Sequence, residues 1–519
     1  MRELAQIENF GGTDADDDPL LLVAFEDHRS YIAVHDLRRY VVLGRKGSGK
    51  TAIFRKLLNT DTGNVLVEGH VFSDYPWHHH AMQRSTGVPD ELCYVSSWEY
   101  LINVSFAKIL LNRDESYPYA EEAWDSAALL ERFIVDTYGV RDPLISNVFT
   151  PSHGISVSGK LGIDLKLASL EVAAERVPFD HLPTIVQEVN RNLLNAILTS
   201  ANPDIKYIVC FDELDLGFTP GDADYAHRLM GLLVAAKRFN SDARKMKRSL
   251  LVVVFLRTDI FNILRFEDRN KILEGGATTI SWDTTPASDK LSSLMEKRFA
   301  SVLAAGRNVA WDDVFEDQDM TSRQRKYSHM LDRTFLRPRD MIKFCNEVLV
   351  AYKVRGGSGK FSNADIISAR RPYSLYLYRE LEDELPKHYP DYAIYFDIVK
   401  EVGVTQFSKN AFSLAYDQHK GRLSEEVPAD AVLARLFEFS IIGYLKSGGG
   451  AVGSLYVWKH KDSDAVFDDR ALWYRVHYGL VEYLELRRRQ RRRERLGVEE
   501  CTDVEAAVDE LEADEVPDN

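Results

Sequence analysis

The chain has 519 residues, enough for about two to four domains, and its hydrophobic and charged fractions of 45% and 28% are typical of a folded globular protein. A formal charge of −15 disfavours a surface that coats nucleic acid without regard to sequence, although a local basic patch is compatible with it. The four cysteines lie far apart, which argues against a disulfide framework and a zinc cluster. No apolar run is long enough to cross a bilayer, and the N-terminus resembles no secretory signal, so we expect a cytoplasmic protein without membrane contact.

The first motif along the chain is a phosphate-binding loop. A buried-strand pattern at residues 40–43 runs into G-x-x-x-x-G-K-T, and a helical pattern follows from Ala52 to Leu58. Glycines let consecutive backbone N–H groups face one anion, and the helix start adds its dipole. We expect Lys50 to reach the β- and γ-phosphates of ATP and the Thr51 hydroxyl to bind Mg²⁺. The residues expected to contact the nucleotide are Gly44, Arg45, Lys46, Gly47, Ser48, Gly49, Lys50, Thr51 and Ala52.

A long stretch then separates this loop from the next motif. It contains a strand pattern at 64–69, helical patterns at 97–111, 123–138 and 185–198, and alternating strands at 155–173. Because a simple nucleotide-binding core needs less chain here, we interpret about 70–200 as an insertion. The run from Trp77 to His80 could bind a metal, but without acidic or cysteine ligands at suitable spacing it also fits a polar loop.

Two carboxylates end the next buried-strand pattern, residues 207–211. We expect Asp212 to hold Mg²⁺ through its waters and Glu213 to orient or deprotonate the attacking water. The alternative is an acidic pair that only caps a strand at the surface. Asp215 is expected to be solvated.

A further buried strand, at residues 250–256, ends in Arg257-Thr258-Asp259. Arg257 or Thr258 could contact the γ-phosphate or its water, and the alternative is a helix cap at Thr258 or Asp259. Charges at 268–271 and Arg298 could also serve a nucleotide, with surface ion pairing as the alternative. A last strand pattern spans 277–282. Apolar runs separated by helices predict an α/β fold, a parallel sheet with helices on both faces.

The second half of the chain divides into a helical block and a mixed domain. A helix begins at Arg337-Pro338-Arg339, where Arg337 or Arg339 could reach a triphosphate or form a basic surface. Three helical patterns followed by a hairpin predict a winged helix, and its helix at 410–418 would enter the major groove of double-stranded DNA or contact a protein. We expect an ATPase core at 1–305, a helical lid and linker at 306–360, a winged-helix-like domain at 361–486 and a tail at 487–519. The tail has an arginine-rich stretch, Arg487 to Arg495, that either grips phosphates or pairs with the acidic residues behind it.

These motifs together resemble the AAA+ superfamily of P-loop ATPases. The resemblance rests on Gly44 to Thr51, the pair Asp212 and Glu213, the polar strand end at Arg257 and Thr258, and the helix start at 337–339. More narrowly, 44–51, 255–261 and 337–340 look like a poorly characterised bacterial group of STAND-like ATPases at mobile and defence-associated loci. A second likeness, to origin-recognition and helicase-loader proteins, rests on 211–215 and the winged helix. The chain departs from that branch by its arginine and threonine in place of asparagine at 257–258 and by its long insertion.

The resemblance implies an ATP-hydrolysing switch that uses Mg²⁺ to regulate a partner protein or DNA, in bacterial defence. It also implies a homo-oligomer in which a neighbouring copy contributes an arginine. One rival interpretation is a DNA-binding initiator in which ATP only gates affinity. Another is an ATP-dependent scaffold with little turnover. Glu213 favours turnover over both rivals.

Overall fold

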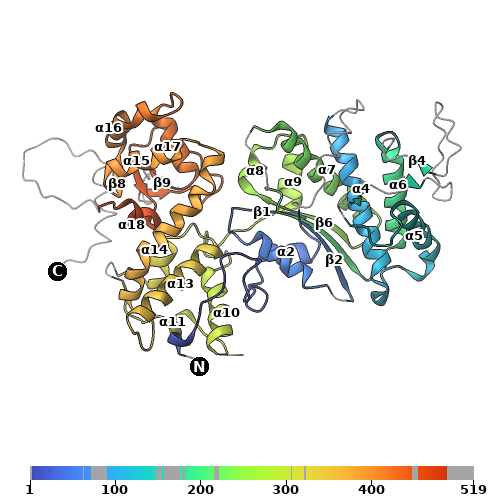
Figure 1. Ribbon diagram of the computed structural model, residues 1–519, viewed down its shortest axis with the longest axis horizontal. Coiled ribbons are helices and arrows are strands. Elements are labelled where there is room, and N and C mark those ends of the chain that lie inside the picture. The colour runs from blue at the N-terminus through green and yellow to red at the C-terminus, as the bar shows by residue number, and fades with distance from the viewer. Residues whose placement is uncertain are drawn as a thin grey trace, which may run out of the picture. The chain divides into compact units, whose positions relative to one another are not determined.

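The computed structural model describes residues 3–61, 63–71, 90–144, 147–148, 155–156, 176–177, 182–215, 221–304, 307–320, 323–446 and 454–487 (Figure 1). The chain divides into two compact units. One unit, which we call the sheet unit, is Asp27–Ile280, and the other, the helical unit, combines Met1–Glu26 with Ser281–Asn519. The domain bounds given above remain a prediction.

A five-stranded parallel sheet forms the centre of the sheet unit, in the order β2-β5-β6-β1-β7. All of β1, β6 and nearly all of β5 are buried, because helices cover the sheet on both sides. This confirms the predicted α/β fold of the P-loop NTPase type. The strands are β1 (Val41–Gly44), β2 (Val65–Val71), β5 (Lys206–Asp212), β6 (Leu250–Arg257) and β7 (Ala277–Thr279).

Helix α2 lies on one face of this sheet, and α4, α7, α8 and α9 lie on the other (Figure 1). The arrangement follows from right-handed crossovers, since the connection from β1 to β2 runs across the sheet in the opposite direction to those that follow. The helices of the unit are α1 (Arg29–His35), α2 (Lys50–Leu58), α4 (Asp90–Asn112), α5 (Trp124–Tyr138), α6 (Leu182–Ser200), α7 (Ala223–Lys245), α8 (Thr258–Ile263) and α9 (Arg269–Gly276).

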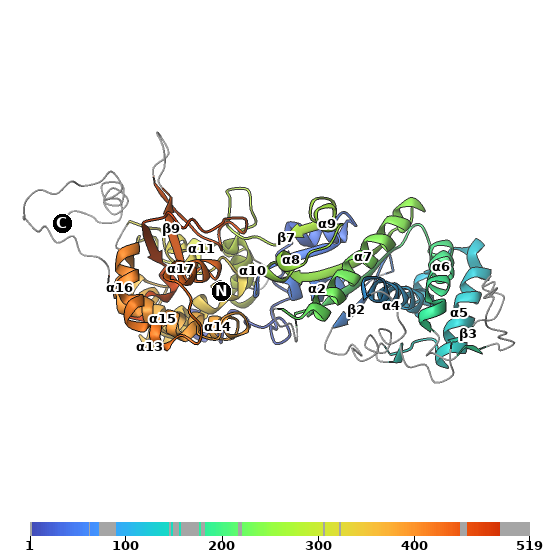
Figure 2. The same ribbon diagram turned by 90° about the horizontal axis from the view of Figure 1, so that it is seen from above.

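The predicted insertion is mainly helical where it is described. Its helix α4 packs against α5, α6 and α7 (Figure 2). Trp98 and Tyr100 on α4 are fully buried. Of the alternating strands expected at 155–173, β3 (Ile155–Ser156) pairs with β4 (Arg176–Val177), and the residues between them lie outside the described chain. The strand expected at 277–282 ends earlier, at Thr279, because Trp282 instead bridges to Asp289 in the helical unit.

The helical unit begins with a layer of helices that encloses the first residues of the chain. Phe10 packs edge-on against Phe299 and Phe361, and its backbone N–H donates to the side-chain oxygen of Asn346. The N-terminal segment is therefore part of this core rather than a free arm. The helices of this layer are α10 (Leu291–Leu303), α11 (Trp311–Val314), α12 (Lys326–Leu331), α13 (Pro338–Val354) and α14 (Asn363–Glu382).

The rest of the helical unit is an α+β arrangement around a small sheet. Its strands have the order β10-β9-β11-β8, and all neighbours are antiparallel. Residues 447–453, between the two strands of the predicted hairpin, lie outside the described residues. The elements are α15 (Tyr392–Val402), β8 (Gln406–Ser408), α16 (Lys409–His419), α17 (Ala429–Glu438), β9 (Ile442–Lys446), β10 (Leu455–Val457), β11 (Trp473–Val476) and α18 (Val481–Leu484).

Candidate functional site

The loop between β1 and α2 has the backbone that its sequence predicts. Gly47 and Gly49 adopt φ angles of 77° and 108°, which favour glycine, and Gly49 is the N-cap of α2. A Cβ atom on Gly44 would clash with the Ser48 hydroxyl, so a larger residue here would force that side chain to move. The loop thus leads directly into the first turn of a helix, an arrangement that suits an anion.

Lys50, the first residue of α2, is folded back over the loop. Its Nζ atom donates to the carbonyl oxygens of Gly44 and Arg45, each at 3.2 Å. Burial lowers the pKa of Lys50, and the carboxylates of Asp215 and Asp212 oppose that shift. The amine is therefore a half-buried cation held among acidic groups, where a phosphate could replace its carbonyl partners.

Asp212 ends β5 beside this amine and is buried. Burial raises the pKa of Asp212, while hydrogen bonds from the Glu213 backbone and the Thr51 side chain lower it. Its Oδ2 atom has no hydrogen-bond partner among the described residues. A buried carboxylate oxygen of this kind beside a threonine hydroxyl fits Mg²⁺, which prefers oxygen ligands and keeps several waters. Asp212 and Thr51 are thus the residues that could hold the ion.

Glu213 follows with a φ angle of 57°, a left-handed conformation that is unfavourable for a residue other than glycine. Backbone strain of about 1–3 kcal/mol persists only where the surroundings impose it, and such positions are concentrated at functional sites. Glu213 is half-buried, so its carboxylate is not sealed in the core. The conformation supports a specific task for this residue.

Arg257 and Thr258 lie at the end of β6, which runs between β1 and β5. The parallel register pairs Arg257 with Gly44, so the arginine begins beside the phosphate loop. The helix cap considered at Thr258 or Asp259 is not found there, because Arg257 is the N-cap of α8 and makes no side-chain cap hydrogen bond. Its guanidinium instead bonds Asp259, with Nε–Oδ1 and Nη2–Oδ2 distances of 3.0 and 2.7 Å.

The sequence did not single out Asp259 and Asp215 as partners of this arginine. Asp215 was expected to be solvated, yet its Oδ2 atom lies 3.5 Å from Nη1 of Arg257. The only sequence signal was proximity, since Asp259 follows Arg257 by two residues. A contact across two strand ends, such as that of Asp215, leaves no periodic pattern in a sequence.

Arg337 and Arg339 belong to the helical unit and are bonded within it. Arg337 is buried and donates to both carboxylate oxygens of Asp340, at 2.9 and 2.8 Å. Arg339 donates to the carbonyl of Thr13 at 2.9 Å and to Glu380 at 3.1 Å. A role for either arginine at a nucleotide remains a prediction.

The other charged candidates form ion pairs. Asp268 pairs with Lys271 at 3.0 Å and with Lys237 at 2.8 Å, as the surface interpretation predicts. Arg298 is instead buried in the helical unit, where it bonds Asp18 at 2.6 Å. The run from Trp77 to His80 lies outside the described residues. Within the described ranges, no group of three or more histidine, cysteine or acidic side chains is placed to hold a metal ion.

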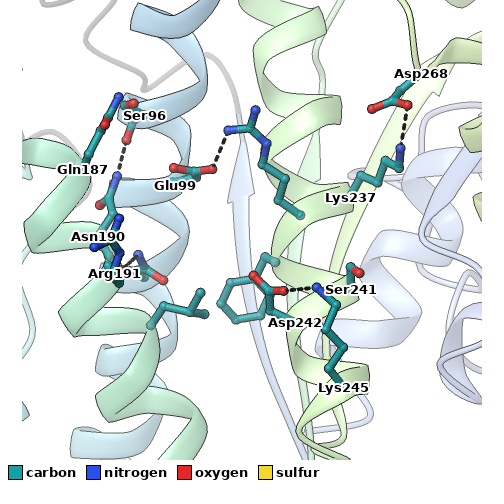
Figure 3. Close-up of a pocket in the computed structure, with 14 residues that line it drawn as sticks. Ser96, Glu99, Gln187, Asn190, Arg191, Lys237, Ser241, Asp242, Lys245 and Asp268 are labelled. Atoms are coloured by element: carbon teal, nitrogen blue, oxygen red, sulfur yellow. Dashed lines mark hydrogen bonds and ion pairs between the residues drawn. The ribbon is translucent and has the colours of Figure 1, made fainter.

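A polar pocket of about 610 Å³ lies between α4, α6 and α7 of the sheet unit, and it contains no residue of the phosphate loop (Figure 3). Its charged side chains face one another in ion pairs: Arg238 with Glu99 at 3.3 Å, Lys237 with Asp268, and Lys245 with Asp242 at 2.8 Å. The Asn190 side chain donates to the carbonyl of Ser96 at 2.7 Å and ties α6 to α4. Among these contacts, the pair of Arg238 with Glu99 joins α7 to α4 of the insertion.

Known proteins are similar to this chain over two different ranges of residues. Residues 289–382, from α10 to α14, match the model of the FunZ-associated C-terminal helical domain. Over 464 residues the chain is 23% identical to the putative transposon gamma-delta 80.3 kDa protein of Escherichia coli (strain K12). That alignment covers 84% of this chain and 61% of the relative, so the chain spans less than two thirds of that protein.

Two solved structures are also similar in part. The Orc1 protein of Aeropyrum pernix in complex with DNA gives a TM-score of 0.34 at 14% identity, with 82% of this chain and 89% of that chain covered. Cdc6p of Pyrobaculum aerophilum gives a TM-score of 0.30 at 12% identity, with 94% and 92% covered. Both likenesses are too distant to carry a function to this chain. Across the described residues, no helix is long and apolar enough to cross a membrane.

Proposed function

We propose that the chain binds ATP with Mg²⁺ and hydrolyses it as an AAA+-type switch protein. The observation that carries this proposal is the cluster of Lys50, Thr51 and Asp212 at the ends of β1 and β5. There a half-buried amine, a hydroxyl and a buried carboxylate oxygen without a hydrogen-bond partner among the described residues converge at a helix start. Few other ligands need an amine, a hydroxyl and a carboxylate oxygen at the same site.

Each residue of the cluster would have one task. The loop N–H groups and Lys50 bind the phosphates, and Thr51 and Asp212 hold the Mg²⁺, which neutralises phosphate charge when bound. Glu213, held in its strained conformation next to Asp212, orients the attacking water and accepts its proton. Arg257 stabilises the charge that develops on the γ-phosphate, and Thr258 positions the water or a phosphate oxygen.

The helical unit would respond to the nucleotide through its lid. Of the two lid arginines, we propose that Arg339 reaches the triphosphate, because Arg337 is buried and two of its guanidinium nitrogens donate to Asp340. Arg339 is less buried, and its contacts with Thr13 and Glu380 are single hydrogen bonds. We also propose a homo-oligomer in which an arginine of a neighbouring copy completes the site.

The switch protein would act on DNA or on a protein partner in the cytoplasm. The order α15, β8, α16, α17, β9, β10 and β11 supports the proposal of a winged helix, and we propose that α16 contacts the partner. The name of the Escherichia coli relative refers to a transposon, which makes double-stranded DNA a natural candidate and fits a mobile or defence locus. DNA binding would depend on the cations that flank α16.

Those cations also support protein recognition as a second candidate. Lys409 pairs with Asp430, Lys420 with Asp417 and Arg422 with Asp397, at 2.9, 2.8 and 2.8 Å. Leu414, on the outer face of α16, is 68% exposed. A balanced surface with an exposed leucine suits a protein better than a phosphate backbone, because each phosphate contact would have to break an existing ion pair.

ATP turnover by the purified chain, with and without double-stranded DNA, tests these proposals together. We expect turnover that falls at least about 100-fold in Lys50→Ala and in Glu213→Gln, with ATP binding retained in Glu213→Gln. Stimulation by DNA would favour the DNA-regulated switch, and indifference to DNA would favour a protein partner. Binding without turnover in the unmodified chain would leave the scaffold interpretation, and affinity for DNA that changes with ATP but not with hydrolysis would favour the initiator.

A further inference from the structure

The end of β6 holds an arginine whose partners are arranged unequally. Arg257 forms a two-point ion pair with Asp259 and a longer contact with Asp215. The Arg257 side chain is 8% exposed, whereas the side chains of Asp259 and Asp215 are 41% and 34% exposed. The cation is thus fixed in the interior, while both of its anionic partners reach water.

These three groups share their surroundings with Lys50. Burial lowers the pKa of Lys50, and Asp215, Asp212 and Asp259 oppose the shift while Arg257 adds to it. The register that pairs Arg257 with Gly44 places the arginine where the phosphate loop begins. A γ-phosphate held by Lys50 would therefore arrive among the same charges that now bind Arg257.

A phosphate can replace an exposed carboxylate at low cost. An arginine bonds carboxylates and phosphates with the same two-point geometry, so one anion can take the place of the other. A carboxylate that is already in contact with water regains its hydration when released, whereas the release of a fully buried carboxylate would leave an uncompensated charge. Asp259 can therefore compete with a phosphate for Arg257 and still be displaced by it.

We propose that Asp259 is a positioning residue that competes with the γ-phosphate for Arg257 and so sets how strongly the chain prefers ATP over ADP. The inference rests on the proposed binding of ATP at this site. With ADP, no γ-phosphate is present and Arg257 stays on Asp259. With ATP, the guanidinium exchanges Asp259 for a phosphate oxygen, and the ion pair reforms after phosphate leaves.

Binding of Mg–ATP and Mg–ADP to the full chain tests this directly, measured by titration calorimetry in the Glu213→Gln background to prevent turnover. We expect Asp259→Asn to lower the Kd for ATP by about ten-fold and to change the Kd for ADP by less than about two-fold, because one charge-assisted hydrogen bond becomes available only to the γ-phosphate. Asp259→Glu should restore the original preference. Asp215→Asn should shift it in the same direction by a smaller factor.

The matched control is Asp36→Asn, which removes the same charge from a surface pair with Arg38 in the same unit. It should change neither affinity. In the Arg257→Ala background, Asp259→Asn should lose its effect on ATP. Equal tightening of ATP and ADP, or tightening that persists without Arg257, would overturn the inference in favour of a simple charge effect. A chain that fails to bind ATP would instead overturn the proposed function.

Discussion

Two buried arginines, one in each unit, form two-point ion pairs with an aspartate a few residues further along the chain. In the helical unit, Arg337 bonds Asp340, whose side chain is fully buried and also accepts the N–H of Phe335 at 2.9 Å. In the sheet unit, Arg257 bonds Asp259, whose side chain is partly in water. Burial alone would lower the pKa of Arg337, but Asp340 raises it above its usual value.

The difference shows how similar contacts can serve different purposes. Asp340 connects an arginine, a backbone N–H and the first turn of α13, so its removal would leave several buried groups without partners. Asp259 has water as a substitute. We therefore infer that Arg337 has a structural role in the helical unit, whereas Arg257 can exchange one anionic partner for another.

The largest expected effect comes from breaking the pair in the helical unit. Asp340→Ala should lower the free energy of unfolding by about 3–5 kcal/mol, because it leaves the Arg337 cation buried without its partner. Urea denaturation followed by circular dichroism measures the loss. Asp417→Ala, at a surface pair with Lys420, is the control and should cost less than about 1 kcal/mol. A similar small loss for both variants would contradict the comparison.

The next effect concerns catalysis in the sheet unit. Arg257→Ala should reduce ATP turnover by about 100-fold, since one preorganised donor to the developing phosphate charge is lost. Steady-state phosphate release measures it, and Lys237→Ala, at a surface pair with Asp268, serves as the control. If Arg257→Ala instead unfolds the chain and leaves turnover per folded molecule unchanged, then Arg257 has a structural role like that of Arg337.

Acid should destabilise the sheet unit through one buried histidine. His70 on β2 is buried beside Phe211 and hydrogen-bonded to Ser105 at 2.7 Å, and burial lowers its pKa to about 3. Below its ordinary pKa of 6.5, the unfolded chain binds a proton at His70 that the folded chain does not. Stability is therefore complete above pH 6.5 and falls as the pH decreases towards 3.

At pH 5 this histidine should cost the sheet unit about 2 kcal/mol relative to pH 7.5. Denaturation of the unmodified chain and of His70→Phe at both pH values measures the cost. The variant should lose less stability on acidification, because phenylalanine has no group that takes up a proton. It keeps the contact with Phe211, and Ser105 still donates to the carbonyl of Leu101, so the variant should fold. Equal losses in the two chains would show that other groups dominate the acid response.

The smallest effect should be the stability change of Asp259→Ala, below about 1 kcal/mol, because water can replace the partly exposed carboxylate beside Arg257 and Asp215 stays 3.5 Å from the same guanidinium. Thermal unfolding without nucleotide measures it. A loss as large as that of Asp340→Ala would mean that the two pairs are equivalent and that Asp259 cannot release its arginine.

Local patterns explain what the sequence could predict. The phosphate loop, the strand ending at Asp212 and the α/β fold could all be predicted, because glycine positions and apolar runs depend on the local backbone conformation. The lengths of α4 and α6 and the end of β7 were less well predicted, since packing and bridges such as that of Trp282 set them. The partners of Arg257 and the buried pair of Arg298 with Asp18, 280 residues apart, depend on tertiary contacts that leave no periodic signal.

The position of Phe10 has a consequence for the synthesis of the chain. Its hydrogen-bond partner Asn346 follows it by 336 residues, and the whole sheet unit is made in between. At translation rates of roughly 5–20 residues per second, the ribosome needs on the order of 20–70 seconds to reach that partner. Phe10 and its apolar neighbours Leu4 and Ile7 must therefore remain uncovered on the nascent chain for that time, which makes this segment a natural binding site for chaperones.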